Sequence, residues 1–470
     1  MKNKDLRRLG LPDGACLETA LRILKAAKAS GRDMRDVSAE LARVAAAPGT
    51  YIDDADYGEL AGLLVGPLSA PSGYTPRPKS APCRIYGEDI DQGALQQMGN
   101  ACRLPVAVAG ALMPDAHQGY GLPIGGVLAT DAAVIPYAVG VDIACRMKMT
   151  VLDLPVSTLA TAQHELTRAI EKETRFGVGA EFSDRRAHAV MDRDWGVTMV
   201  TRRLKDKAWA QLGTSGSGNH FVEFGVLEVF EAVGGLPPGE YLALLSHSGS
   251  RGSGATVAQH YSKVARELHP ELPHELSQLA WLNLASEAGA EYWAAMELMG
   301  AYAAANHELI HRHVASALGA AVRLDVENHH NFAWRERHVL ADGSERDVIV
   351  HRKGATPAGL GVLGIIPGSM AAPGYLVRGK GDTASLQSAS HGAGRRMSRT
   401  RAKQEYTWED ARRVLEARGV TLLSAGLDEV PMAYKDIDTV MAAQASLVDA
   451  IARFNPRLVK MAPAGEAPED

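Results

Sequence analysis

Asp142 and Cys145 are candidate metal ligands because of their types and their spacing. The segment VGVDIACRM places the carboxylate three residues before the thiol. A carboxylate and a thiolate this close can share a borderline-soft divalent ion such as Mn²⁺ or Zn²⁺. A buried cysteine that packs as a small hydrophobic residue gives the same local sequence. The pair alone therefore leaves a metal site and a core cysteine both open.

Three further segments place histidines at the ends of apolar runs, each beside a loop of small residues. In chain order they are GTSGSGNHFVEF with His220, LLSHSGSRGSG with His247, and LDVENHHNFAW with His329 and His330. A single histidine of this kind is more often structural. Four segments that each offer a nitrogen or sulfur ligand predict one convergent metal centre.

A phosphate site is indicated by SASHGAGRRMSR, residues 388–399, where His391 lies among small residues and is followed by arginines. Glycine lets a backbone approach a ligand closely, and arginine binds phosphate through a bidentate fork. The loop IIPGSMAAPGYLVRGKG at 365–381 has a similar character. The alternatives are a turn whose histidine caps a helix and a solvated basic face.

A competing motif lies in a helical stretch. The segment NHELIH contains His307, Glu308 and His311 in the H-E-x-x-H spacing of zinc peptidases. Histidines at i and i+4 share one face of a helix, so this geometry could hold zinc. No extension of the motif and no second helix with a glutamate follows, so we expect a solvated or packed helix instead.

The composition is that of an ordinary globular protein. Of the 470 residues 46% are hydrophobic and 22% are charged, and the formal net charge is −5, so nucleic acid would need a local basic patch. The four cysteines form no C-x-x-C pair and are too few for a disulfide framework. We find no signal core and no apolar run long enough to span a bilayer. We therefore expect a cytoplasmic protein with no membrane partner.

The elements that position these residues follow from apolar spacing and from glycine and proline. Two stripes at helical spacing predict a helical N-terminal unit: Leu17, Ala20, Leu21, Ile23 and Leu24, then Val37, Leu41 and Val44. Short apolar runs ending in glycine loops predict a mixed α/β main body, with a helical stretch over 255–318. The predicted parts are a helical accessory unit at 1–75, a connector at 76–82 within the Pro-rich run 66–82, a main body at 83–460 and a disordered tail at 461–470.

Seven motifs in this order resemble the RtcB family of GTP- and manganese-dependent RNA-splicing ligases. They are GVDIxC, GNHxxE, HSGSRG, HHN, HRKGA, PGSM and SHGAGR, and the similarity runs from about residue 81 to about residue 460. The resemblance implies the family's α+β (mixed α/β) fold, with a single large catalytic domain and a buried pocket for two metal ions. The N-terminal 75 residues match nothing in the compact bacterial members, which makes them an accessory unit.

The resemblance assigns roles residue by residue. The metal ligands would be Asp142, Cys145, His220, His247 and His330, with the cysteine bridging two Mn²⁺ ions. The histidine of SHGAGR, His391, would be the one that becomes guanylylated. The residues around the guanylate would be Asn219, Glu223, Asn331, Pro367, Gly368, Ser369, Met370, Gly392, Ala393, Gly394, Tyr434 and Lys460. Lys460 matches only after a shift of one residue.

The implied reaction is the joining of RNA ends. An RNA 3′-phosphate, or a 2′,3′-cyclic phosphate opened first by water, would be activated with GTP and then joined to a 5′-hydroxyl. The same thiolate and imidazole ligands could hold Zn²⁺ or Co²⁺ in place of Mn²⁺. Candidates for contacts to the RNA backbone are Arg378, Lys380 and the arginines after His391, and we expect a monomer. Whether an activating protein factor takes part is left open.

Some positions depart from the family pattern. Gly374 stands where a serine is frequent, so one contact to the nucleotide is expected to be missing, and MPDAHQGYG and SGSGNHF also differ. None of these changes touches a predicted metal ligand or His391. Two alternatives remain: a metal-dependent nucleotidyltransferase or phosphoesterase with a non-RNA substrate, and a non-catalytic protein that binds RNA ends.

Overall fold

The computed structural model describes residues 5–6, 9, 11, 15–46, 48–51, 54, 56–65 and 74–465. The chain divides into two compact units, Met1–Gly73 and Tyr74–Asp470. Residues 66–73 of the predicted proline-rich connector lie outside the described residues.

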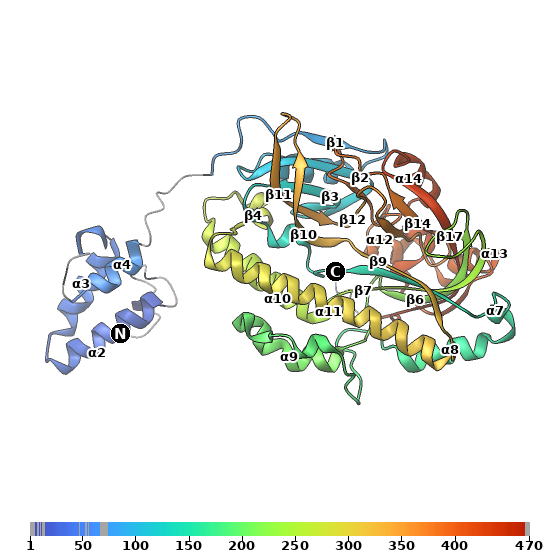
Figure 1. Ribbon diagram of the computed structural model, residues 1–470. Helices are drawn as coiled ribbons and strands as arrows, with labels where there is room; N and C mark the ends of the chain where they lie inside the picture. The colour runs from blue at the N-terminus through green and yellow to red at the C-terminus, as the bar shows by residue number, and fades with distance from the viewer. Residues whose placement is uncertain are drawn as a thin grey trace. The chain divides into compact units, whose positions relative to one another are not determined.

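The N-terminal unit is helical. Its elements are α2 (Ala15–Ala29), α3 (Met34–Ala46), the short 3₁₀ helix η1 (Pro48–Tyr51) and α4 (Gly58–Val65) (Figure 1). Both predicted apolar stripes face one small core, in which Leu41, Val44 and Leu60 are fully buried. The helices form where the apolar spacing predicts them because each must bury one face against the others.

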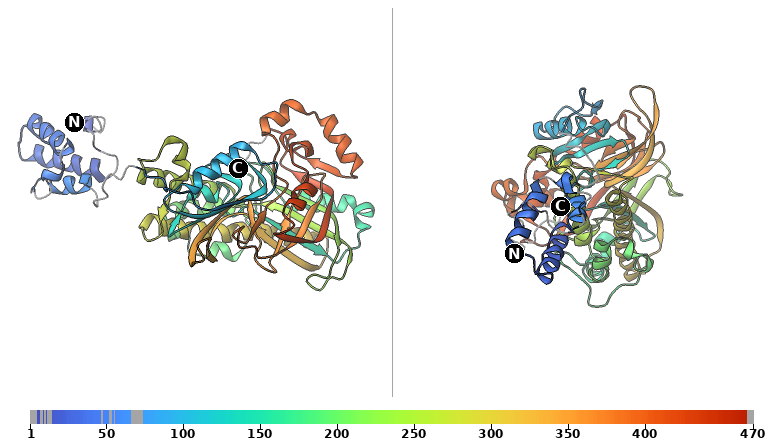
Figure 2. Two further views of the ribbon diagram at one scale, coloured as in Figure 1. Left: turned by 90° about the horizontal axis from the view of Figure 1, so that it is seen from above. Right: turned by 90° about the vertical axis from the view of Figure 1, so that its left-hand side faces the viewer.

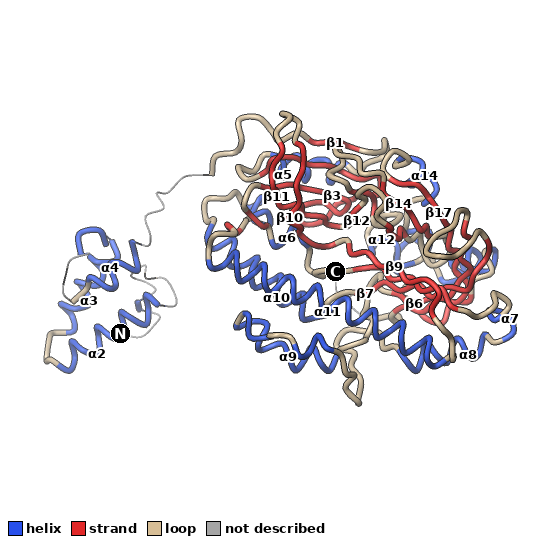
Figure 3. The backbone as a smooth tube through the Cα atoms, viewed as in Figure 1, coloured by secondary structure: helices blue, strands red, loops and turns tan. Residues whose placement is uncertain are grey.

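The larger unit is built on two main sheets, which confirms the predicted mixed α/β class (Figure 3). The first sheet has the spatial order β1 (Cys83–Ile85), β2 (Ala107–Tyr120), β3 (Leu122–Thr130), β11 (Glu345–Lys353) and β10 (Asn331–Val339). The second has the order β13 (Leu363–Ile366), β14 (Gly374–Gly379), β17 (Val448–Met461), β6 (Phe221–Val229), β7 (Gly239–Ser248), β5 (Arg146–Leu152) and β9 (Val322–His329), with β16 (Thr421–Ser424) paired on β17. Two short pairs are β12 (Ala355–Pro357) with β15 (Ser388–Ser390), and β4 (Ala133–Val134) with β8 (Leu282–Asn283).

Helices cover the sheets. They are α5 (Gln92–Cys102), α6 (Pro136–Val139), α7 (Thr158–Thr161), α8 (Gln163–Glu173), α9 (Met199–Gln211), α10 (Arg251–Leu268), α11 (Glu287–Ala317), α12 (Arg399–Glu405), α13 (Trp408–Ala417) and α14 (Ile437–Ala443). The longest, α11, runs beside the larger sheet, and its Ile310 packs with Phe224 and Leu244 (Figures 1 and 2). Helix α11 covers one face of the sheet, and a second hydrophobic core lies against the other face.

The larger sheet curls so that its two end strands approach each other. The Asn328 side chain on β9 accepts a hydrogen bond from the Ile365 backbone N–H of β13 at 2.8 Å and donates one to the Ile365 carbonyl at 3.3 Å. Apolar residues such as Met149, Leu245 and Phe454 fill the enclosed side. Because side chains alternate along a strand, residues in phase with these also face inward at the strand ends.

The C-terminal strand β17 extends further than predicted. A disordered tail was expected from residue 461, but Met461 pairs with Phe221 at the end of the β6–β17 ladder. Backbone hydrogen bonds to β6 order this residue. Residues 466–470 of the predicted tail lie outside the described residues. Within the described ranges, no helix is both long and apolar enough to cross a membrane.

Candidate metal centre and phosphate cavity

Neighbouring strands of the larger sheet bring the candidate metal ligands together. Met147 on β5 pairs with His247 on β7, and on its other side β5 pairs with β9, which ends at His329. Cys145 lies just before β5 and His330 just after β9, so both fall at the same end of the sheet as His247. His220 immediately precedes β6, the strand beside β7. The ligands therefore converge because adjacent strands end at one edge.

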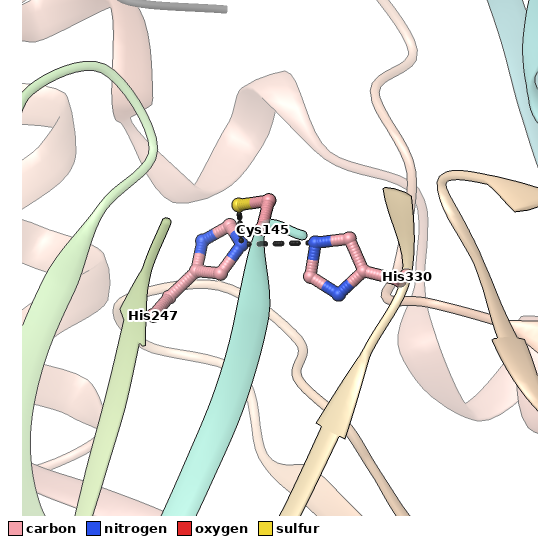
Figure 4. Close-up of side chains that lie close together, drawn as sticks. All are labelled: Cys145, His247 and His330. Carbon is pink, nitrogen blue, oxygen red and sulfur yellow. Dashed lines mark hydrogen bonds between the residues drawn. The ribbon is translucent and has the colours of Figure 1, made fainter. Parts of the chain in front are cut away.

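The ligand atoms lie within bonding reach of common points. Cys145 Sγ is 3.1 Å from His247 Nε2 and 3.4 Å from His220 Nε2. His247 Nε2 is 3.1 Å from His330 Nε2 (Figure 4). Two groups of potential ligands result, one of Cys145, His247 and His330 and the other of Asp142, Cys145 and His220. Cys145 belongs to both, so its thiolate is placed to bridge two ions.

Hydrogen bonds to backbone carbonyls fix the imidazole rings. His220 Nδ1 lies 2.8 Å from the Ser215 carbonyl and His247 Nδ1 lies 3.0 Å from the Asn219 carbonyl, so each Nδ1–H donates outward. The lone pair of each Nε2 then faces the centre, as in metal-bound histidines. Burial and the nearby His220 charge lower the pKa of His247 to about 3, and burial lowers the pKa of His330 well below its ordinary value. Both imidazoles are therefore neutral, which is the form that binds a metal.

Asp142 is held as an ionised carboxylate. Ser250 donates to its Oδ1 from the backbone N–H at 3.0 Å and from the hydroxyl at 3.2 Å. Burial raises the pKa of Asp142, but the groups around it, among them His220 and Arg251, outweigh burial, so the pKa lies below its ordinary value. Its Oδ2 is buried without a hydrogen-bond partner, 3.1 Å from His220 Nε2. A Cβ on Gly249 would come within 2.1 Å of this oxygen, so the first glycine of HSGSRG cannot carry a side chain.

The donor set fits a divalent ion of intermediate softness. The set has one thiolate, three imidazoles and one carboxylate, which are ligands that bind Mn²⁺, Zn²⁺ or Co²⁺. Mg²⁺ and Ca²⁺ prefer sites made of oxygen ligands alone. An unpartnered buried carboxylate oxygen and two neutral imidazole nitrogens only 3.1 Å apart are costly to leave without a cation between them. The residues present therefore fit a buried metal centre.

His391 lies beside this centre in the loop after β15, and its ring is oriented by a carboxylate. The ring centroids of His391 and His330 are 5.0 Å apart. His391 Nδ1 is 2.7 Å from Asp115 Oδ2, and the His391 backbone N–H donates to the same oxygen at 3.2 Å. With Nδ1–H directed at Asp115, the lone pair of Nε2 is free to act as a nucleophile. Sequence reasoning missed Asp115; the only signal was an acidic residue inside the apolar run before HQGYG.

A cavity of about 680 Å³ joins the metal ligands to His391. The predicted residues that line it are Asp142, Cys145, Asn219, Glu223, His247, His330, Asn331, Pro367, Gly368, Ser369, Met370, His391, Gly392, Ala393, Gly394 and Tyr434. His220 is buried among the other ligands. Lys460 is the exception, since its Nζ lies 3.5 Å from Glu171 Oε1 while its neighbours Val459 and Met461 line the cavity.

One part of the cavity carries a network of charged and hydroxyl groups. The Tyr434 hydroxyl contacts Glu429, which also pairs with Arg395 and Arg399. Glu223 also lines the cavity, and burial raises the pKa of its carboxyl well above the ordinary value. Gly374 lines the same cavity without offering a hydroxyl. This part can therefore recognise a polar ring that has both donors and acceptors.

The basic residues predicted to contact RNA differ in their availability. Arg378 pairs with Glu231 at 2.5 Å, and Lys380 pairs with Asp449 at 2.7 Å. Arg396, by contrast, is exposed, lines the cavity and has no side-chain partner among the described residues. Of the described arginines that line the cavity, Arg395 and Arg399 pair with Glu429, whereas Arg396 has no acidic partner.

The H-E-x-x-H segment forms a buried hydrogen-bond chain on α11, apart from both ligand groups. His307 Nδ1 lies 2.7 Å and His311 Nε2 lies 2.8 Å from the Ser246 hydroxyl, and His311 Nδ1 lies 2.7 Å from the Thr150 hydroxyl. Glu308 points the other way, is half exposed and contacts His188. The motif thus braces β5 and β7 behind the metal centre, as expected of a packed helix.

Comparisons with known proteins agree with the site. A family model described as tRNA-splicing ligase RtcB matches residues 97–198 and 193–461. The RNA-splicing ligase RtcB of Escherichia coli K12 is 34% identical over 404 residues, covering 79% of this chain and 95% of that protein. The RNA-splicing ligase RtcB of Mycobacterium tuberculosis is 33% identical over 427 residues (77% and 98%), and the tRNA-splicing ligase RtcB of Methanococcus maripaludis is 30% identical over 424 residues (75% and 88%).

Proposed function

The chain belongs to the RtcB family, and from that premise we propose that it is an RNA ligase. It joins an RNA 3′-phosphate or 2′,3′-cyclic phosphate end to a 5′-hydroxyl end. The observation that carries the proposal is His391, whose Nδ1 is bound by Asp115 and whose ring stands beside the two ligand groups. The cavity of about 680 Å³ is large enough for a nucleotide.

In the first step His391 Nε2 attacks the α-phosphorus of GTP. A P–N bond forms, the bond to the β-phosphate oxygen breaks, and pyrophosphate leaves with the electron pair. The ring keeps its Nδ1 proton and gains positive charge, which the Asp115 carboxylate at 2.7 Å stabilises. Manganese held by Asp142, Cys145, His220, His247 and His330 would supply positive charge to the phosphoryl oxygens, and zinc or cobalt would suit the same ligands.

The later steps transfer the guanylate and seal the strand. An oxygen of the RNA 3′-phosphate attacks the guanylate phosphorus, the P–N bond breaks, and its electron pair returns to His391 Nε2. The 5′-hydroxyl oxygen then attacks the RNA 3′-phosphorus, GMP leaves, and the hydroxyl proton passes to solvent. A cyclic phosphate needs prior hydrolysis, in which water adds across one P–O bond.

The guanylate occupies the part of the cavity that has the polar network. The Glu223 carboxyl hydrogen-bonds to the ring, and Tyr434 borders the ring. The phosphate lies against the small residues of the two loops, Pro367–Met370 and Gly392–Gly394, where backbone can come close. Asn219 and Asn331 also line the cavity, and the Asn331 amide hydrogen-bonds to the Asp142 carbonyl and the Gly354 backbone N–H. Lys460, which contacts Glu171 in the structure, stays a prediction.

Labelling with GTP tests the proposal. The protein is incubated with Mn²⁺ and GTP labelled at the α-phosphate, and the chain should gain an acid-labile, alkali-stable label. His391→Ala should gain none, whereas Glu308→Gln, an exposed change on α11, should label like wild type. A 3′-phosphate RNA should discharge the label, and addition of a 5′-hydroxyl RNA should give the joined strand.

Each arm can fail separately. No label on the wild-type protein, or an undiminished label on His391→Ala, would refute the nucleophile. A label that RNA cannot discharge would point instead to a nucleotidyltransferase with another acceptor. Peptide hydrolysis that Glu308→Gln abolishes would support the peptidase alternative. The cytoplasmic location and the monomeric state stay predictions from the sequence.

A further inference from the structure

The β2–β3 hairpin gives the cavity a second part, which shares no residue with the predicted guanylate contacts. Gln118, Gly119 and Tyr120 at the end of β2, together with Tyr137 on α6 and Lys353 on β11, line the cavity there. The reaction requires room for an RNA end beside the guanylate. This second part is where that end can enter.

Tyr120 is 72% exposed although it lines the cavity. Its ring therefore contributes little to the packing of the fold, and an exposed aromatic side chain at a cavity mouth is available to a ligand. The hairpin tip that carries it is nevertheless ordered. Lys353 Nζ donates to the Tyr120 carbonyl at 2.5 Å, and a Cβ on Gly121, at φ +70°, would lie only 3.0 Å from the Gln278 carbonyl.

The hairpin tip is linked to His391 through Lys353 and Gly354. Lys353 contacts Tyr120, and the next residue, Gly354, lies against the His391 ring, where an added Cβ would be 3.1 Å from Cε1. Lys353 Nζ also lies 5.1 Å from the centre of the Tyr137 ring. An aromatic face, a cation and the nucleophile thus follow one another along this part of the cavity.

We propose that Tyr120 is the platform on which the base of the RNA 3′-terminal nucleotide stacks while its phosphate reaches the guanylate on His391. This inference rests on the proposed function and adds a subsite for the acceptor strand. Single-stranded RNA ends are commonly held by stacking of bases on aromatic side chains beside basic groups. Because every base has a π-face, the subsite accepts any base and favours purines, which stack more strongly.

Substitutions at Tyr120 test the platform. With wild-type enzyme as reference, Tyr120→Ala should weaken binding of a 3′-phosphate RNA by about five- to 150-fold, the range measured for loss of one stacked base. Tyr120→Phe and Tyr120→Trp should bind within about threefold of wild type, because they keep the ring. Leu360→Ala changes a side chain that is 85% exposed but does not line the cavity, and it serves as the matched control.

An abasic substrate isolates the stacked base. If the 3′-terminal nucleotide lacks its base, wild type and Tyr120→Ala should bind the RNA equally. The rate of His391 labelling by GTP, which precedes RNA binding, reports whether each variant is folded. Binding is measured by fluorescence anisotropy with an RNA that carries a 3′-phosphate.

Several outcomes would overturn the platform. They are unchanged RNA binding by Tyr120→Ala, an equal loss in Tyr120→Phe, and a loss that persists with the abasic 3′ end. The affinity lost in Tyr120→Ala could instead disappear only when the nucleotide at the 5′-hydroxyl end is abasic. That result would assign Tyr120 to the other strand and refute the proposal. If wild type ligates RNA normally in these assays, only the platform fails; if wild type gains no label and binds no RNA end, the ligase function fails with it.

Discussion

Replacing Asp115 by asparagine tests how the nucleophile is set up. Asp115 is fully buried, and its Oδ2 accepts from both Nδ1 and the backbone N–H of His391. In Asp115→Asn the backbone N–H favours an oxygen at that position, so the amide keeps its oxygen toward His391. The hydrogen bonds and the ring tautomer are then preserved, and the main change is loss of the negative charge.

The size of the effect follows from the distance. The oxygen lies 2.7 Å from Nδ1, so its charge is about 4 Å from the centre of the positive charge that develops on the ring. Two unit charges at that separation interact with about 4 kcal/mol when the effective dielectric constant is about 20. At about 1.4 kcal/mol per factor of ten, guanylylation should slow by about 10²- to 10⁴-fold.

Single-turnover labelling with saturating GTP measures this step directly. The manganese content of Asp115→Asn should equal that of wild type, because Asp115 belongs to neither ligand group. The new amide N–H₂ replaces the buried Oδ1, which has no hydrogen-bond partner, so thermal unfolding should be followed as well. Labelling of a folded, metal-replete Asp115→Asn within about threefold of the wild-type rate would refute the role of the carboxylate.

Three further predictions concern the metal centre, its support and the pH profile. Cys145→Ser should lower the manganese retained after gel filtration more than His330→Ala, because Cys145 serves both ligand groups; equal losses would contradict a bridging thiolate. Ser246→Ala leaves two buried histidine nitrogens without their hydroxyl partner and should lower the free energy of unfolding by about 2–5 kcal/mol, measured by urea denaturation. Burial lowers the pKa of Lys353 to about 7, so above pH 7 binding of a phosphate anion requires proton uptake, and affinity for 3′-phosphate RNA should fall by up to about tenfold per pH unit. Lys353→Met should remove that slope, and an equally steep slope in this variant would exclude Lys353 as its source.

The sequence could predict which residues gather at the candidate metal centre because the relevant signals are local. A strand that ends in a glycine loop leaves its last residues at the edge of a sheet, as for His247, and His330 lies at the same edge between β9 and β10. When several strands of one sheet end in such residues at the same edge, the side chains come close together. The predicted mixed α/β class and the N-terminal helices depend on similarly local patterns of apolar spacing.

Residues whose roles depend on distant partners could not be predicted. Asp115 contacts His391 across 276 positions of the chain, and nothing near either residue indicates the pairing. Arg378 and Lys380 were expected to contact RNA, but both pair with acidic side chains from other strands or loops. Lys460 lies on β17, where successive side chains point to opposite faces of the sheet. Its neighbours Val459 and Met461 face the cavity, so the Lys460 side chain points away from it and reaches Glu171.

The segment NHELIH shows why spacing alone does not define a metal site. Histidines at i and i+4 present two nitrogens on one face of a helix, whether that helix binds zinc or only packs against a sheet. A zinc site needs a third ligand and an open position opposite that face. Here the facing groups are the hydroxyls of Ser246 and Thr150, and burial lowers the pKa of His307 and of His311 well below the ordinary value. Hydroxyls can donate hydrogen bonds to neutral imidazoles and accept them, but they do not hold zinc. The residues on the facing strands therefore decide that this motif stabilises the strand that carries His247 and does not bind a metal.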